Sequence, residues 1–195
     1  NNKKNILIIQ YDYPLSTITR DFAISLSKNG YKVQLILCYS KVGWLIKKKN
    51  MKGQNIDYVI INSFSILKRV LNKIYTKIIL KNNRLLKIIF HFINIEKILI
   101  NDKIVKKIFS KVCEKKEDII SIIGIEKKGL IYAGKIADII NRPLIYYSLE
   151  LYTDEHPVNQ SNIIAKKILE LEKVYHKKSL ATIVQDNDRA DFLFK

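Results

Sequence analysis

The residues of this chain that could do chemistry follow short apolar runs of the sequence. Glu150 comes just after one such run, within the segment Ser148–Tyr152. A carboxylate in that place can hold a hydroxyl group or assist a proton transfer; the alternative is a carboxylate that caps a helix or lies on the surface. Other polar side chains follow the other apolar runs: Asp12, Ser16, Thr17, Arg20, Glu126, Asp154, Glu155, His156, Asp186 and Arg189.

The apolar runs predict β-strands that alternate with helices. A helix from Ser16 or Thr17 to Asn29 is predicted between strands at Ile6–Ile9 and Tyr31–Cys38, and Gly30 stands where a positive φ is wanted. Further strands are predicted at Ile56–Ile61, Asp118–Ile123, Pro143–Ser148 and Ala181–Gln185, and further helices at Gly129–Asn141 and Asn162–Ser179.

This alternation predicts the fold class and the place of the site. Strands separated by helices favour an α/β domain with a doubly wound, mostly parallel, Rossmann-like sheet. We expect residues 1–195 to form one such domain. In open sheets of this kind the ligand lies at the carboxyl ends of the strands, which is where the polar side chains above would gather.

Composition excludes several classes of protein. With 48% hydrophobic residues, the chain is not a disordered polyelectrolyte despite its net charge of +17. Two cysteines cannot build a secreted disulfide framework, so a reducing compartment is expected. No uncharged apolar stretch reaches the roughly 18 residues that span a bilayer. The chain lacks an initiator methionine and stops inside a last helix, predicted to be capped by Asp186 or Asn187, which indicates a piece of a longer protein.

The positive charge is concentrated in one part of the sequence. Residues 41–116 hold 19 Lys and Arg against four acids, and the rest of the chain is nearly neutral. Within them, residues 64–114 show apolar residues at helical spacing with lysines between, which predicts a basic amphipathic helical insertion. Such a segment favours an anionic partner. The alternative is A/T-rich codon bias, with the apolar residues packed on the sheet and the lysines merely solvated.

Cofactor and metal chemistry find little support. No Gly-x-Gly-x-x-Gly pattern follows the first strand and there is no P-loop, which argues against NAD and ATP in this half of the protein. His91, His156 and His176 lie far apart and match no metal-ligand spacing, so no metal site is predicted. His176, in a charged helix, is expected to be solvated.

Four segments occur in an order that is typical of one enzyme family. They are Asn5–Pro14, which ends in a Tyr-Pro pair; Phe22–Val33, a helix–strand turn around Gly30; Arg142–Tyr152; and Glu170–Asp186. In this order they resemble the N-terminal domain of a GT-B fold glycosyltransferase of the group 1 retaining family. The family's glycine pair is missing from the first loop, and Leu149 stands where the family has a histidine.

The resemblance implies the acceptor-binding half of a hexosyltransferase-type enzyme that makes a surface polysaccharide or a glycolipid. The family binds its nucleotide-sugar donor in a second, C-terminal domain, for which 195 residues leave no room. No cofactor is therefore expected in this domain, and the chain alone is expected to be inactive. A sugar or lipid-linked acceptor is implied, with Glu150 as the catalytic residue. The expected acceptor-binding residues are Asp12, Ser16, Thr17, Arg20, Glu126, Asp186 and Arg189.

The resemblance also suggests what the basic insertion meets. A cationic amphipathic helix can lie on anionic lipid, which implies a cytoplasmic enzyme held peripherally at the inner face of the cell membrane. The expected docking residues are Lys68, Arg69, Lys73, Lys77, Lys81, Arg84 and Lys87.

Two alternatives stay open. The chain could be a basic nucleic-acid-binding module, although residues 64–114 hold few arginines and no known nucleic-acid-binding signature. It could also be a Rossmann-like binding protein without catalysis. The oligomeric state is not indicated by the sequence.

Overall fold

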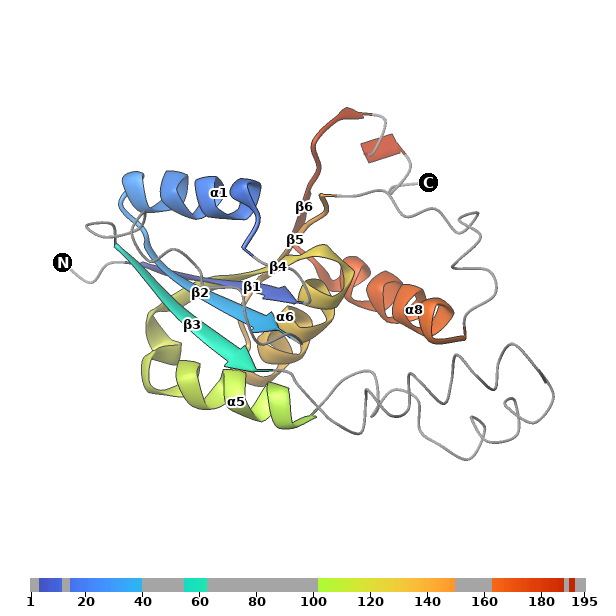
Figure 1. Cartoon of the computed structure of the whole chain (residues 1–195), viewed down its shortest axis with the longest axis horizontal. Coiled ribbons are helices and arrows are strands. Elements are labelled where there is room, and N and C mark those ends of the chain that lie inside the picture. The colour runs from blue at the N-terminus through green and yellow to red at the C-terminus, as the bar shows by residue number, and fades with distance from the viewer. Residues whose placement is uncertain are drawn as a thin grey trace.

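The structure is a computed structural model that describes residues 4–11, 15–39, 55–62, 102–149, 163–187 and 190–191. A six-stranded parallel sheet forms its centre, in the order β3-β2-β1-β4-β5-β6 (Figure 1). This order confirms the predicted doubly wound α/β fold. The strands are β1 (Asn5–Tyr11), β2 (Lys32–Tyr39), β3 (Ile56–Asn62), β4 (Ile119–Ile125), β5 (Leu144–Tyr147) and β6 (Ala181–Ile183).

Helices cover both faces of the sheet. One face is covered by α1 (Thr17–Lys28), and the other by α5 (Asp102–Val112), α6 (Glu126–Ile140) and α8 (Ile163–Lys178) (Figure 1). Every residue of β1 is buried, and its side chains alternate between two apolar cores. Leu7 and Ile9 pack toward α6, whereas Ile6 and Ile8 pack toward α1. The unbroken apolar run Ile6–Ile9 is what a parallel sheet covered on both faces requires.

Glycines explain where the predicted boundaries were wrong. We predicted that the strand Asp118–Ile123 ends at Gly124 and that the next helix starts at Gly129, but β4 runs to Ile125 and α6 starts at Glu126. A Cβ on Gly124 would lie 2.4 Å from Leu130 Cα, and one on Gly129 would lie 2.7 Å from the carbonyl oxygen of Ile9. Both glycines therefore allow close packing of α6 on the sheet. The positive φ predicted at Gly30 is confirmed, at 90°.

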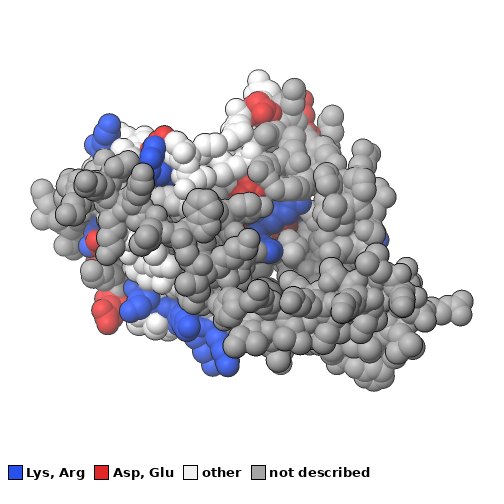
Figure 2. All heavy atoms as spheres, viewed as in Figure 1, with Lys and Arg blue, Asp and Glu red and all other residues white. Residues whose placement is uncertain are grey.

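The last part of the predicted basic insertion is a helix of the core. In α5 the apolar side chains of Ile104, Val105, Ile108 and Val112 are buried against the sheet and α6. The outer face of α5 carries the exposed Lys103, Lys106, Lys107 and Lys111. Figure 2 shows Lys and Arg side chains gathered along the lower edge of the molecule, over α5. Residues 64–101, with all seven predicted docking residues, lie outside the described part of the chain.

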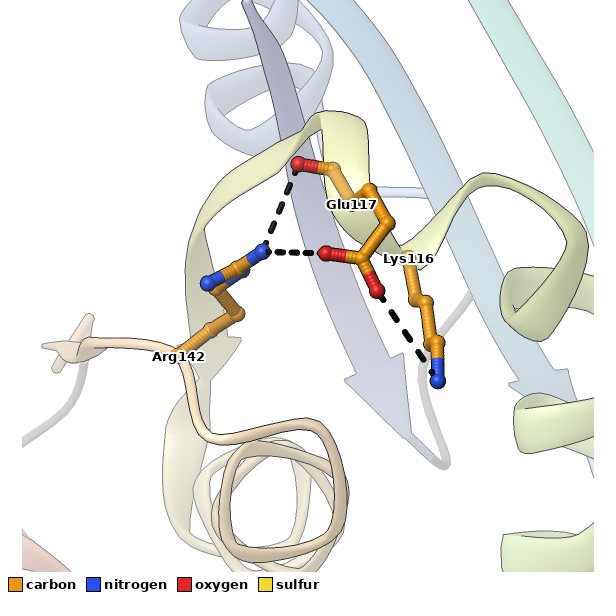
Figure 3. Close-up of polar contacts among 3 residues, drawn as sticks. All are labelled: Lys116, Glu117 and Arg142. Atoms are coloured by element: carbon orange, nitrogen blue, oxygen red, sulfur yellow. Dashed lines mark hydrogen bonds and ion pairs between the residues drawn. The ribbon is translucent and has the colours of Figure 1, made fainter.

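A small charged cluster ties two turns together at the amino edge of the sheet. Arg142, just before β5, donates through Nη2 to the carbonyl oxygen of Glu117 at 3.3 Å and to its Oε2 at 3.4 Å (Figure 3). Lys116 Nζ lies 3.9 Å from Glu117 Oε1. The cluster is exposed, and ion pairs of this kind contribute at most about 1 kcal/mol. It lies at the opposite edge of the sheet from the carboxyl ends of the strands.

Candidate functional site

The centre of the sheet contains the topological switch point. The chain places β2 and β3 on one side of β1 and then returns to place β4 on the other side. The carboxyl ends of β1 and β4 are therefore the expected place for a ligand. Five polar residues lie in or just beyond β4 and β5 or reach them from α8, and we call them the carboxyl-edge cluster: Glu126, Lys127, Tyr146, Ser148 and Glu172.

The start of α6 is held close beneath the switch point. Tyr11, the last residue of β1, stacks on Tyr132 of α6 with ring centroids 4.6 Å apart and an interplanar angle of 12°. Lys128 Nζ lies 5.6 Å from the centroid of the Tyr11 ring, within cation–π range. With the close approach of Gly129 to Ile9, these contacts fix the first turn of α6, which carries Glu126 and Lys127.

Glu126 occupies an unusual backbone conformation at the junction of β4 and α6. Its φ is 59°, in the left-handed region, which costs a residue with a Cβ about 1–2 kcal/mol. The residue is only 8% exposed. Its Oε1 accepts a hydrogen bond from the backbone N–H of Leu149, two residues beyond β5. A buried carboxylate thus joins the carboxyl ends of two neighbouring strands.

Tyr146, Glu172 and Lys127 form a buried polar chain between β5, α8 and α6. The Tyr146 hydroxyl donates to Glu172 Oε1 at 2.6 Å, and Lys127 Nζ lies 3.4 Å from Glu172 Oε2. Burial, and after it the charge of Glu172, raises the pKa of the Tyr146 hydroxyl far above its usual value. The phenol therefore stays protonated and serves as a fixed hydrogen-bond donor.

His176 extends this chain toward the edge strand. Its Nε2 lies 2.8 Å from Thr182 Oγ1 in β6, and its ring packs edge-on against Tyr146 with centroids 5.4 Å apart. Burial lowers the pKa of His176, and the nearby Glu172 carboxylate opposes that shift. The expectation that His176 is solvated was therefore wrong, because the side chain is half-buried between α8 and the sheet.

The other predicted acceptor residues lie apart from this cluster or outside the described residues. Ser16 caps α1, where its Oγ accepts from the Thr19 N–H at 3.0 Å and its hydroxyl donates to Thr19 Oγ1 at 2.8 Å. Thr17 is the exposed first residue of α1, and Arg20 pairs with Asp21 at 3.0 Å. Asp186 is exposed beyond β6. The predicted residues outside the described part of the chain are Asp12, Glu150, Asp154, Glu155, His156 and Arg189.

Sequence reasoning missed most of the carboxyl-edge cluster, including Lys127, Tyr146, Ser148 and Glu172. A signal for Glu172 was present in the helical period. Ile168, Leu171, Glu172 and Tyr175 recur at i, i+3, i+4 and i+7, so the carboxylate lies on the inner stripe of α8. A carboxylate on an inward stripe needs a buried partner, which here is provided by Tyr146 and Lys127.

Two features are absent from the part of the chain that the structure describes. No group of three or more His, Cys, Asp or Glu side chains among them could hold a metal ion. Among the helices that the structure describes, none offers an apolar stretch that would cross a bilayer.

Comparison with solved structures finds UDP-glycosyltransferases of the GT-B fold. UGT2 of Phytolacca americana, complexed with UDP-2fluoro-glucose and pterostilbene, matches 95% of this chain and 48% of its own, with a TM-score of 0.57 and 8% sequence identity. The apo structure of UGT2 matches 94% of this chain and 46% of its own, with a TM-score of 0.42 and 8% identity. No protein-family model and no curated protein matches the chain.

The match concerns the fold of the chain and its length. This chain spans about half the length of the UGT2 chains that it matches. At 8% identity the likeness concerns the fold. The chain therefore has a Rossmann-like fold similar to half of a GT-B glycosyltransferase.

Proposed function

We propose that this chain is the acceptor-binding half of a nucleotide-sugar-dependent glycosyltransferase. The observation that carries the proposal is the match of nearly the whole chain to about half of UGT2, a protein solved with UDP-2fluoro-glucose. A second, donor-binding domain would complete the enzyme, and no cofactor would be bound by this half. On its own the chain would then be inactive.

The sequence motifs refine the proposal. The order of Asn5–Pro14, Phe22–Val33, Arg142–Tyr152 and Glu170–Asp186 favours the group 1 retaining family, and with it a surface polysaccharide or glycolipid as product. We place the acceptor, a sugar or a lipid-linked sugar, at the carboxyl ends of β1, β4 and β5. Of the candidate residues there, Glu126 has its carboxylate on the backbone of Leu149, next to Glu150 in the chain.

Glu150 is the proposed catalytic residue. A carboxylate that follows a strand of the sheet can hold the attacking hydroxyl of the acceptor and take its proton as the new glycosidic bond forms. General-base assistance of this kind contributes about 10²–10⁴-fold to a rate. The bond between the donor sugar and the diphosphate breaks at the same time, and the nucleoside diphosphate leaves with its electron pair and would stay with the donor domain.

The first test is transfer by the complete enzyme. We expect nucleoside diphosphate to be released from one of a panel of nucleotide sugars when a lipid and glycan extract supplies acceptors. Glu150→Gln should lower turnover at least tenfold, because the amide cannot accept the proton. Glu170→Gln is the matched control, since Glu170 is exposed on α8 and pairs only with Lys167 among the described residues. Unchanged turnover in Glu150→Gln would remove Glu150 from the site, and no release from any donor would contradict the proposed function.

The proposed place of the enzyme is the cytoplasmic face of the cell membrane, to which it would bind peripherally. The lysines of α5 support this proposal. Lys106, Lys107 and Lys111 are exposed on one helix face and make no ion pair with residues that the structure describes. Since the apolar face of α5 is buried in the core, α5 can offer only charge, at about 1 kcal/mol per lysine near an anionic surface. The predicted docking residues of 68–87 would add to it.

Co-sedimentation with vesicles tests the docking. We expect the chain to sediment with anionic but not neutral vesicles, and to be released by high salt. Replacing Lys106, Lys107 and Lys111 by Gln should weaken binding at least tenfold. The matched control replaces three exposed lysines of α8, Lys166, Lys173 and Lys177, and should have a smaller effect. Binding of duplex DNA without binding of vesicles would favour a nucleic-acid-binding module instead.

A further inference from the structure

Glu126 sits where the hydrogen-bond ladder between β4 and β5 comes to an end. The last paired residues are Ile125 of β4 and Tyr147 of β5. The segment that follows β4 is helical from Glu126 onward, in α6. In the segment that follows β5, the Ser148 N–H donates to the carbonyl oxygen of Ile183 in β6 at 3.0 Å. The Leu149 N–H donates instead to the Glu126 carboxylate, which replaces the next rung of the ladder by a side chain.

The backbone conformation of Glu126 is one that a glutamate rarely adopts. A φ of 59° favours glycine or asparagine, and a glutamate there carries a conformational cost. With 8% of the residue exposed, little of its surface is left to touch an acceptor. Its charge also acts within the cluster, where it contributes to the raised pKa of Tyr146. The presence of glutamate at this position is therefore explained by contacts that its carboxylate makes inside the protein.

We propose that Glu126 is a positioning residue, whose carboxylate fixes the direction in which the chain leaves β5. The hydrogen bond holds the backbone N–H of Leu149, so it determines where the next peptide unit starts. A carboxylate that accepts from a backbone N–H makes a charge-assisted bond, about twice as strong as a neutral one. This inference rests on the proposed function, in which Glu150, the next residue in the sequence, acts on the acceptor.

The first measurement needs no substrate. Hydrogen exchange of the Leu149 amide, resolved by NMR in the 195-residue chain, should be at least tenfold faster in Glu126→Ala than in the unchanged protein. Glu126→Gln keeps an acceptor oxygen at the same reach, so exchange should stay within about threefold. Both variants keep a Cβ at the same φ, and so they share the backbone cost. Glu117→Gln, a carboxylate at the amino edge of the sheet, is the control and should change nothing at Leu149.

The second measurement separates positioning from contact with the acceptor. In the complete enzyme, Glu126→Ala should raise the acceptor KM at least tenfold, and Glu126→Gln should restore most of the loss. A Gln variant as impaired as the Ala variant, with Leu149 still protected, would show that the charge itself acts on the substrate and would overturn the inference. Unchanged exchange at Leu149 in Glu126→Ala would overturn it as well.

The two proposals can fail separately. If Leu149 exchange responds as expected but the complete enzyme transfers no sugar, the proposed function is wrong and Glu126 still positions the chain. If transfer is found while Glu126→Ala changes neither Leu149 exchange nor the acceptor KM, only the inference about Glu126 is wrong.

Discussion

Replacing Gly124 by alanine should lower the free energy of unfolding by about 3 kcal/mol. The added Cβ would lie 2.4 Å from Leu130 Cα, 2.7 Å from Leu130 N and 3.0 Å from Ala133 Cβ. Two of these atoms belong to the backbone of α6, which cannot rotate out of the way as a side chain can. The helix would have to move away from β4, and this would disturb the packing of Leu130 and Ala133 in the core. Urea unfolding followed by circular dichroism measures the effect.

Gly30→Ala is the matched comparison for Gly124→Ala. Gly30 has a φ of 90°, and no atom lies within 4 Å of a Cβ placed there. Alanine at Gly30 therefore meets only backbone strain, about 1–2 kcal/mol. A loss at Gly124 no larger than the loss at Gly30 would mean that α6 yields easily, and that the close approach contributes little to stability.

Replacing Glu172 by alanine should cost about 3 kcal/mol, because it breaks a buried ion pair and a buried hydrogen bond together. The side chains of Lys127 and Glu172 are 15% and 10% exposed, so water can replace the lost carboxylate only in part. The Tyr146 hydroxyl, fully buried, loses the acceptor that lies 2.6 Å away. We expect a lower urea midpoint and weaker near-ultraviolet dichroism from Tyr146.

A neighbour on the same helix provides the control for Glu172→Ala. Glu170 is exposed and pairs with Lys167 at 2.9 Å, so Glu170→Ala should change stability by less than about 0.5 kcal/mol. Glu172→Gln keeps an acceptor for the Tyr146 hydroxyl and should recover part of the loss. Equal effects of Glu172→Ala and Glu170→Ala would contradict the buried network described above.

The N-terminal half of the fold was predictable because local signals agree there. Ile6–Ile9 is apolar without a break, Ser16 is a good helix cap, and Gly30 suits the left-handed turn before β2. Each element could be read from its own residues, and their alternation gave the parallel sheet. At the β4–α6 junction the predicted bounds were wrong. The local sequence does not distinguish a glycine that ends an element from a glycine that allows two elements to pack closely.

The site was less predictable because it depends on pairings that are distant in sequence. Glu126 was a candidate by its place after a strand, but its bond to Leu149 spans 23 residues and its positive φ leaves no mark in the sequence. Tyr146 and Glu172 are 26 residues apart and meet only when α8 folds back on β5. The predictions for Asp12, Glu150 and Arg189 concern residues outside the described part of the chain and stay predictions.

The strand order also bears on how the chain acquires its structure during synthesis. β1 pairs with β4, whose residues follow about 115 positions later, while β1, α1 and β2 are close in sequence. At roughly 5–20 residues per second on a ribosome, one edge of β1 has no strand to pair with for about 6–23 s. During that time a strand with the apolar run Ile6–Ile9 remains open to pairing with other chains. The nascent N-terminal half should therefore be the stage at which aggregation is most severe and a chaperone is most useful.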